Sequence, residues 1–336
     1  MGNIPKRRIY KSAQEIPYIN YVPNDGRGVV LSGYYDCEMQ QFYTHMLVPD
    51  GTIVALPALD MLEGTYIARA PANERLDCRL PLLETTINHF SFGDMLSVLR
   101  DAERDLINGL ASLHKYFVLL HHVNGHKDHS GNLLISTEVE YAFGNHRSFY
   151  DLLHKMISII RRYYQEKAPE LPDSFARIAA KDAQELMDKY ALPEPLIDFY
   201  KNRENVFLQL RDIRDNIFHH GHSPDSSYTF PDGFAVRVED RLAKRLVNLD
   251  LWPEDLLRKN RLGSILAILA FLVNDMFDAM DGLQASLLAC FEVLPPPTIS
   301  GHMVFLRSTV SIHLVSLGEY RREHWFNPEE ILSISE

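Results

Sequence analysis

A helical repeat of apolar residues that begins after Ser91 places the strongest limit on what this chain can fold into. Ser91-Phe92-Gly93-Asp94 resembles a capping box, which marks the start of a helix. Apolar residues then recur three or four positions apart, at Met95, Leu99, Ala102, Leu106, Leu110, Leu113, Phe117 and Leu120. Asn124-Gly125 is expected to end the repeat. The pattern therefore predicts a long amphipathic helix.

Three further segments carry helical signals after this one. They run from Glu138 to about Tyr164, from about Ser174 to Tyr190, and from Pro195 to Gly221. The third segment ends before Pro193, because the residue that precedes a proline disfavours the helical region. Four amphipathic helices with modest connections are typical of an antiparallel up-and-down bundle.

The flanking segments carry other signals. Short β-prone runs between glycine, proline and asparagine breakers predict a small strand-rich region at the N-terminus. An Asp232-Gly233 pair predicts a hairpin, which Pro231 limits to a sheet edge. Helical patterns resume at Glu254 with a break at Gly263, and again after the proline run that ends at Pro297. We expect a mainly α protein with three parts: a strand-rich region at 1–85, a bundle at 86–292 with a hairpin insertion at about 222–253, and a helical extension at 293–336.

Charge and composition exclude several classes of protein. The 336 residues include 34 Lys plus Arg against 45 Asp plus Glu, a net charge of −11, which excludes extensive nucleic-acid binding but not a localised cleft. Cys37, Cys78 and Cys290 have neither metal-ligand nor disulfide spacing, so a reducing, cytoplasmic location is expected. The longest uncharged apolar run, Leu262 to Val273, is too short to span a bilayer. We expect no membrane segment.

The residues that could carry out chemistry lie at the end of the fourth predicted helix. Arg214, Asp215 and Asn216 are followed by His219, His220 and Gly221. An arginine, a polar residue and a histidine after four intervening positions resemble the signature of the HEPN superfamily (higher eukaryotes and prokaryotes nucleotide-binding). His220 fits a variant with five intervening residues, so either histidine could be the motif residue.

The resemblance implies a helical bundle with this motif near the end of a late helix. Many HEPN proteins are metal-independent endoribonucleases, in which the ribose 2′-hydroxyl attacks the adjacent phosphate and leaves a cyclic phosphate. By this resemblance Arg214 would clamp the phosphate, His219 would transfer protons, and Asp215 would orient one of them, with Asn216 and His220 as further catalytic candidates. No cofactor or metal is implied. RNA is the implied substrate, and toxin or defence systems with a protein antitoxin or regulator are the implied setting.

Helix geometry restricts how these residues can cooperate. At about 100° per residue, Arg214 and His219 lie about 140° apart around an ideal helix, and Arg214 and His220 about 120°. Either the helix ends or distorts before the histidines, or two subunits supply the residues. The resemblance favours the second answer, because HEPN nucleases build a composite site across a homodimer.

Four other polar residues are candidates for binding the substrate. Asn145, Arg147 and Asp151 lie on the second predicted helix and could form a wall of the same groove, while Arg211 precedes the motif by one turn. Ordinary ion pairs at helical spacing, between Arg147 and Asp151 and between Arg211 and Asp215, are the simpler interpretation. The motif itself is equally compatible with a helix face that only carries solvated charges.

Two other functions stay open. A non-catalytic HEPN-like module that binds RNA or a protein would need no turnover by Arg214 and His219. A metal-binding helical protein is the weaker alternative, and it rests on the histidines and aspartate between His121 and His129. Because Asn124-Gly125 is expected to break the helix between His122 and His126, we expect a solvated loop and no metal site there.

Overall fold

The computed structural model describes the chain in ten stretches of residues. These are residues 7–19, 33–58, 61, 63–126, 130–165, 167–219, 227–237, 249, 251–294 and 301–326, with the backbone alone for residues 126, 214–219 and 254. The chain divides into two compact units, each built from segments that are distant in sequence. Unit 1 comprises residues 1–100, 156–168 and 280–311, and unit 2 comprises residues 101–155, 169–279 and 312–336.

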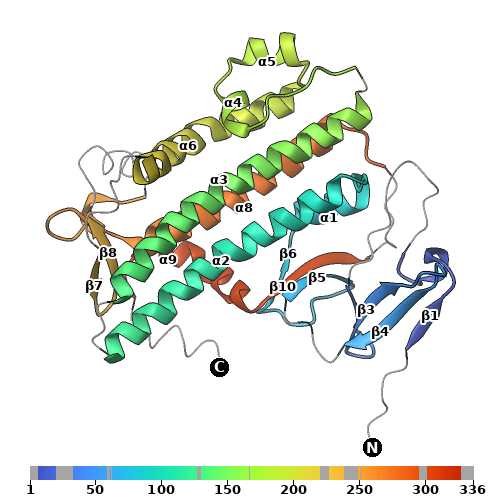
Figure 1. The fold of residues 1–336 in the computed structure, drawn as a ribbon, viewed down its shortest axis with the longest axis horizontal. Helices are drawn as coiled ribbons and strands as arrows, with labels where there is room; N and C mark the ends of the chain where they lie inside the picture. The colour runs from blue at the N-terminus through green and yellow to red at the C-terminus, as the bar shows by residue number, and fades with distance from the viewer. Residues whose placement is uncertain are drawn as a thin grey trace, which may run out of the picture. The chain divides into compact units, whose positions relative to one another are not determined.

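Unit 1 is organised around a mixed seven-stranded sheet with the strand order β1-β4-β3-β2-β5-β10-β6 (Figure 1). Its strands are β1 (Arg8–Tyr10), β2 (Gly33–Asp36), β3 (Gln41–Leu47), β4 (Ile53–Ala58), β5 (Glu63–Ala68), β6 (Asp77–Arg79) and β10 (Met303–Ser308). Neighbouring strands are antiparallel except β2 and β5, which pair in parallel. The β10 strand lies between β5 and β6, so the C-terminal part of the chain completes an N-terminal sheet.

A buried ion pair fixes β10 in this sheet. The Arg307 guanidinium donates to both oxygens of Asp77 at 2.6 and 2.9 Å, and the Tyr66 hydroxyl donates to the same carboxylate at 2.7 Å. The Arg307 guanidinium also lies 4.7 Å from the centroid of the Phe42 ring. Since each polar group of this cluster has a partner, the charges can be buried beside the aromatic core.

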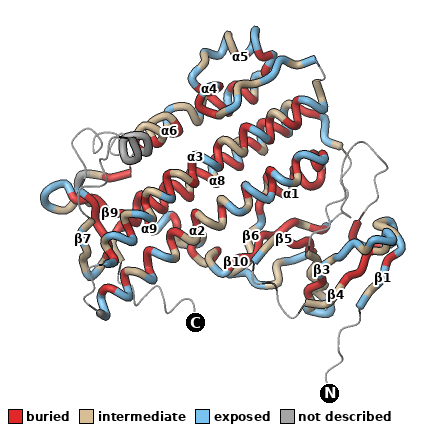
Figure 2. The backbone as a smooth tube through the Cα atoms, viewed as in Figure 1, coloured by how far each residue is buried: buried red, intermediate tan, exposed pale blue. Residues whose placement is uncertain are grey.

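Unit 2 is built mainly from long helices. The helices of the chain are α1 (Pro81–His89), α2 (Met95–His126), α3 (Ser130–Tyr164), α4 (Phe175–Ala179), α5 (Ala183–Tyr190), α6 (Glu194–His219), α8 (Ile265–Cys290) and α9 (Leu317–Glu323), with short 3-10 turns η1 (Ala13–Glu15), η2 (Glu254–Leu256) and η3 (Thr309–Ser316). Residues 265–273 of α8 are all buried (Figure 2). This burial explains why that segment is apolar all round.

A small antiparallel sheet of unit 2 contains β7 (Ser227–Phe230), β8 (Gly233–Arg237) and β9 (Leu262–Ser264). The predicted Asp232-Gly233 hairpin is confirmed as the connection between β7 and β8. Gly263 lies in β9, and a Cβ atom at this position would overlap the Trp252 ring. The close approach of the indole, rather than a helix break, requires the glycine.

The expectation of a mainly α bundle is wrong. A seven-stranded and a three-stranded sheet accompany the helices, so the fold is mixed α and β. The segment after the proline run is expected to be helical, but its residues 303–308 form β10, because pairing with β5 and β6 outweighs the local pattern. The Asp232-Gly233 hairpin gains β9 as a third strand, from a stretch expected to be helical.

Three helix boundaries also differ from expectation. Asn124-Gly125 does not end α2, which continues to His126, and α3 begins at Ser130, ahead of Glu138. The segment expected as one helix from 174 to 190 is two, because Asp182 caps α5 by accepting a hydrogen bond from the Glu185 backbone N–H at 2.7 Å. No helix among the described residues has both the length and the apolarity to cross a membrane.

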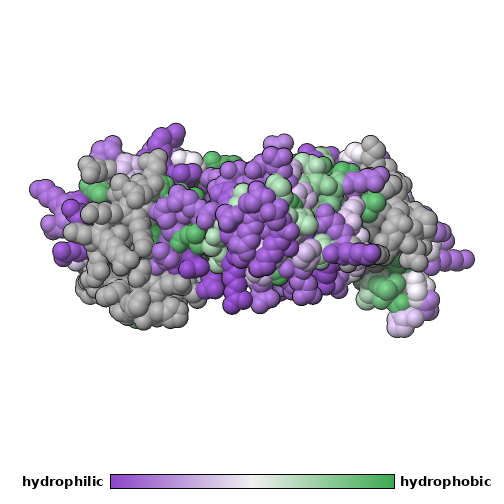
Figure 3. Space-filling view, turned by 90° about the horizontal axis from the view of Figure 1, so that it is seen from above, coloured by the Kyte–Doolittle hydropathy of each residue, from purple (hydrophilic) through white to green (hydrophobic). Residues whose placement is uncertain are grey.

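The exposed surface over α5 is strongly polar. In the view of Figure 3 hydrophilic residues gather in the middle, over α5. Gln184, Asp188 and Lys189 of this helix are exposed, whereas Leu186 and Tyr190 are buried beneath them. The helix therefore covers unit 2 with one apolar stripe and presents its polar face outward.

Candidate functional site

The motif residues lie at the C-terminal end of α6. Apolar side chains along one side of this helix are buried, including Leu196, Tyr200, Phe207, Leu210 and Ile213. This stripe anchors the helix up to the residue before Arg214. The backbone remains helical through His219, while His220 lies outside the described residues.

The sequence leaves open whether α6 ends or distorts between Arg214 and His219, and the structure answers this question. A helix that ended or distorted before His219 could bring this histidine close to Arg214, but the helix is continuous through both positions. The two positions therefore stay about 140° apart around the axis.

Contacts between α3 and α6 show which part of α3 lies beside the motif. The Tyr150 and Phe207 ring centroids are 5.1 Å apart, and the His154 Nδ1 atom lies 2.8 Å from the Tyr200 hydroxyl. These contacts show that the helices run antiparallel, side by side (Figure 1). Moving seven residues along α6 from Phe207 to Arg214 corresponds to about seven residues back along α3, to about residues 140–143.

Two of the candidate substrate-binding residues contact different helices. Asp151 accepts a hydrogen bond from the Phe175 backbone N–H at 2.9 Å, which holds the start of α4. Asn145, which is 7% exposed, donates to the backbone oxygen of Asp105 at 2.7 Å on α2. The two residues therefore serve different neighbours, α4 and α2.

The two candidate arginines lie on α3 and α6. Arg147 is half-buried and forms no ion pair with Asp151, although the two are one turn apart and both are described. The Arg211 guanidinium lies 3.9 Å from the carboxylate of Asp212. Its expected partner, Asp215, has no described side chain, so that ion pair stays a prediction. The wall of one shared groove is likewise still a prediction.

A buried polar cluster that the sequence analysis missed lies between α3, α6 and α8. The Tyr150 hydroxyl donates to Asp275 Oδ2 at 2.7 Å, and the Nε2 atom of His146 lies 2.8 Å from the same oxygen. Arg203 donates to Asp275 Oδ1 at 3.4 Å and to the backbone oxygen of Asp278 at 2.7 Å. The signal in the sequence is Asp275 itself, an acid two residues after the apolar run that ends at Val273.

The electrostatics of this cluster favour an ionised carboxylate. Burial alone would raise the pKa of Asp275, but hydrogen bonds from His146 and Tyr150 and the charge of Arg203 hold it below its ordinary value. Burial raises the pKa of Tyr150 well above its ordinary value. Since His146 and Asp275 are 2% and 5% exposed, the cluster is closed to a substrate and stabilises the helix packing.

The histidine-rich segment after His121 is only partly described. The α2 backbone is helical through His126, so the expected break at Asn124-Gly125 is wrong, while residues 127–129 lie outside the described stretches. No group of three His, Cys, Asp or Glu side chains among the described residues is arranged to hold a metal ion. Comparisons with protein-family models, with curated proteins and with solved structures found no match. The HEPN resemblance stays a prediction that rests on the residues of α6.

Proposed function

We propose that this chain is a metal-independent endoribonuclease whose active site forms between two copies of the chain. The observation that carries the proposal is the unbroken helix of α6 through Arg214 and His219. Because positions about 140° apart lie on different sides of one helix, the proposal takes the guanidinium from one copy and the imidazole from a facing helix of a second copy. The site therefore pairs Arg214 of one copy with His219 of the other.

The residue types suit the chemistry of RNA cleavage. The ribose 2′-oxygen forms a bond to phosphorus while the bond from phosphorus to the 5′-oxygen breaks. The 2′-hydroxyl loses its proton to a base, the departing 5′-oxygen gains one from an acid, and a cyclic phosphate remains. An imidazole can serve in either role near neutral pH, and a guanidinium fork can stabilise the phosphoryl oxygens.

The position of His219 supports the acid role. It is the last residue of α6 that the structure describes, and Gly221 is expected to end the helix, whose C-terminal carbonyl groups would favour a protonated imidazole. Buried apolar side chains up to Ile213 hold α6 against its neighbours directly before the motif. Asp215 completes the proposal as the group that orients Arg214 or the histidine.

The first experiment incubates the purified chain with total RNA in EDTA. The wild type should cleave RNA and leave cyclic phosphate ends, whereas Arg214→Ala and His219→Ala should be inactive while folding normally by circular dichroism. Asp198→Asn is the control, because Asp198 is an exposed acid near the other end of α6. Absence of cleavage by the wild type would reject the nuclease and favour a module that only binds RNA or a protein.

Mixing the two inactive variants tests the composite site. After exchange of subunits, half of the dimers contain one of each variant, and in these one site of two has both residues intact. The mixture should therefore recover about a quarter of the wild-type activity. A mixture that stays inactive, although native mass spectrometry detects mixed dimers, would place the complete site within one chain.

A further inference from the structure

An outward-facing stripe of side chains runs along α3 with the spacing by which helices pair. Its members recur three and four residues apart, at Leu134, Thr137, Tyr141, Gly144 and Ser148. At about 100° per residue they lie within about 80° of one another around the helix. All five are exposed or half-exposed, so this α3 stripe faces away from the core of unit 2. Alternating steps of three and four residues are the repeat that packs one helix against another.

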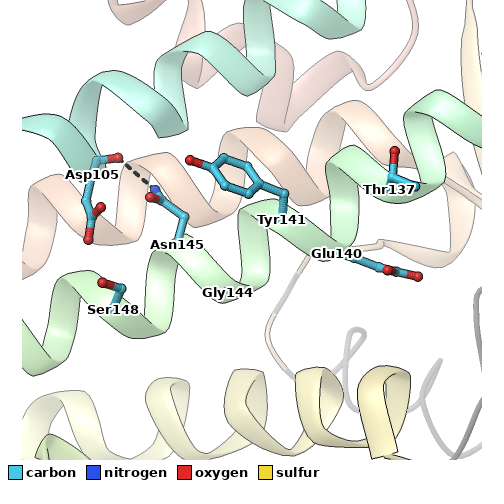
Figure 4. Close-up of a pocket in the computed structure, with 7 residues that line it drawn as sticks. All are labelled: Asp105, Thr137, Glu140, Tyr141, Gly144, Asn145 and Ser148. Atoms are coloured by element: carbon cyan, nitrogen blue, oxygen red, sulfur yellow. Dashed lines mark hydrogen bonds between the residues drawn. The ribbon is translucent and has the colours of Figure 1, made fainter.

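The α3 stripe borders an open groove between α2 and α3. The groove has a volume of about 510 Å³, and Thr137, Tyr141 and Ser148 lie along it (Figure 4). A Cβ atom at Gly144 would meet nothing within 4 Å, so there is room for a further side chain at this position. Leu134 and Tyr141 are large and apolar, yet they are 49% and 45% exposed. Exposed apolar side chains that adjoin open space indicate a surface for another protein.

The α3 stripe is complementary in size to a reversed copy of itself. When two α3 helices lie antiparallel about a two-fold axis at Val139, residues at equal distances on either side of Val139 face each other. Leu134 of one copy then lies opposite Gly144 of the other, and Tyr141 lies opposite Thr137. A large side chain meets a small one in both pairs, and the symmetry repeats each pair. Such alternation allows the side chains of two helices to interdigitate.

The same axis brings the two motifs to one level. The contacts that hold α3 and α6 side by side relate positions on the two helices. By these contacts Val139 lies level with about residues 215–218 of α6. The midpoint between positions 214 and 219 falls in this range, so the axis places position 214 of one copy level with position 219 of the other. The side-chain sizes on α3 and the level of the motif on α6 therefore give the same centre.

The carboxylates nearest this axis have partners within their own chain. The Lys115 ammonium lies 3.1 Å from the Glu138 carboxylate. Glu140, on the other side of Val139, also has an interaction partner. Two copies can therefore meet at this level without bringing unpaired carboxylates together.

We propose that two copies of this chain pair through the α3 stripe, with their α3 helices antiparallel and the two-fold axis at Val139. The inference rests on the proposed function, because a composite active site requires a second copy of the chain as the occupant of this surface. Leu134 of each copy fills the space beside Gly144 of the other. The pairing sets positions 214 and 219 of different copies level with each other at two equivalent sites.

Analytical ultracentrifugation of the full chain tests the surface. The wild type should sediment as a dimer, and Leu134→Lys should raise the dimer dissociation constant at least about tenfold, because it places a charge where an apolar side chain is buried. Met187→Lys is the matched control, since Met187 on α5 is 48% exposed and lies outside the α3 stripe. It should dimerise like the wild type, and circular dichroism checks that both variants fold. A monomeric wild type, or equal dissociation constants for the wild type and Leu134→Lys, would overturn the inference.

Oxidative cross-linking tests the register. In the double variant Leu134→Cys/Gly144→Cys, the two new cysteines of one chain lie about 15 Å apart along α3, too far for a disulfide, but each faces the other position in the second copy. The double variant should therefore give a covalent dimer. Each single variant should not, because its two copies of the cysteine lie about 15 Å apart across the axis. The wild type, with free Cys37, Cys78 and Cys290, sets the background. Cross-linking of a single variant as complete as that of the double variant would contradict the register and overturn the inference.

RNA cleavage by the same samples separates this inference from the proposed function. A chain that dimerises through the α3 stripe but does not cleave RNA would reject the nuclease and support the interface. A chain that cleaves RNA and recovers activity when the two inactive variants are mixed, but whose dimer is unaffected by Leu134→Lys, would support the nuclease and overturn the interface.

Discussion

The imidazole rings of His313 and His114 contact each other through ring nitrogens 3.2 Å apart. His313 is 2% exposed, stacks on Phe117 with the ring planes 13° apart, and its Nδ1 atom lies 3.1 Å from the Tyr320 hydroxyl. Burial, together with the charge that His114 would carry, lowers the pKa of His313 to about 4. A protonated His313 is therefore disfavoured in the folded chain.

We expect stability to fall in mild acid for this reason. Below about pH 6.5 the unfolded chain protonates this histidine, but the folded chain does not until about pH 4. The free energy of unfolding should therefore decrease as the pH falls through this window, by about 2–3 kcal/mol from His313. Urea denaturation between pH 4 and 7.5 measures the decrease. His313→Gln should flatten the profile, while a profile as steep as that of the wild type would contradict the assignment.

Removal of the Asp275 carboxylate should destabilise unit 2 strongly. Asp275→Ala would leave the Tyr150 hydroxyl and the Arg203 guanidinium without their shared acceptor. The free energy of unfolding should fall by about 3–5 kcal/mol. Chemical denaturation followed by circular dichroism measures the loss. Asp198→Ala, at an exposed position of α6, is the matched control and should change stability by less than about 0.5 kcal/mol. Equal effects would show that the buried cluster contributes nothing.

Alanine in place of Gly144 should stabilise the protein. The new methyl group meets no atom within 4 Å, so the change keeps the gain in helix propensity, about 0.5–1 kcal/mol. Gly109→Ala should gain less, because its Cβ would lie 3.3 Å from the side chain of Val273. Thermal unfolding of the two variants ranks them. A larger gain at Gly109 would contradict the open space observed around position 144.

Arg258 should hold the hairpin of unit 2 to the Trp325 segment. Its guanidinium donates to both oxygens of Asp232 at 2.6 and 2.7 Å and lies 4.0 Å from the centroids of both the Phe230 and Trp325 rings. Arg258→Lys keeps the charge but removes the planar guanidinium, and it should lower the free energy of unfolding by about 1–2 kcal/mol. A red shift of tryptophan emission would report exposure of Trp325. Emission and stability like those of the wild type would show that a point charge suffices.

The candidate active site could be located from the sequence, because its signals are local. The helical repeat that runs to Ile217 predicted α6 with Arg214 and His219 near its end, and the described helix includes both positions. Periodicity alone could not say whether the helix stays regular through His219. The angle between the two positions became definite only with the observed backbone.

What the sequence determined by itself is the set of long helices and the Asp232-Gly233 hairpin, since apolar spacing and turn residues act between near neighbours. Only the tertiary structure decided that residues 303–308 form a strand and that Asp275 accepts hydrogen bonds from Tyr150 and Arg203. A strand forms when segments distant in sequence provide partners for its backbone hydrogen bonds. A buried acid is stable when distant residues donate hydrogen bonds to it. These partners lie far apart along the chain, so no local pattern contains them.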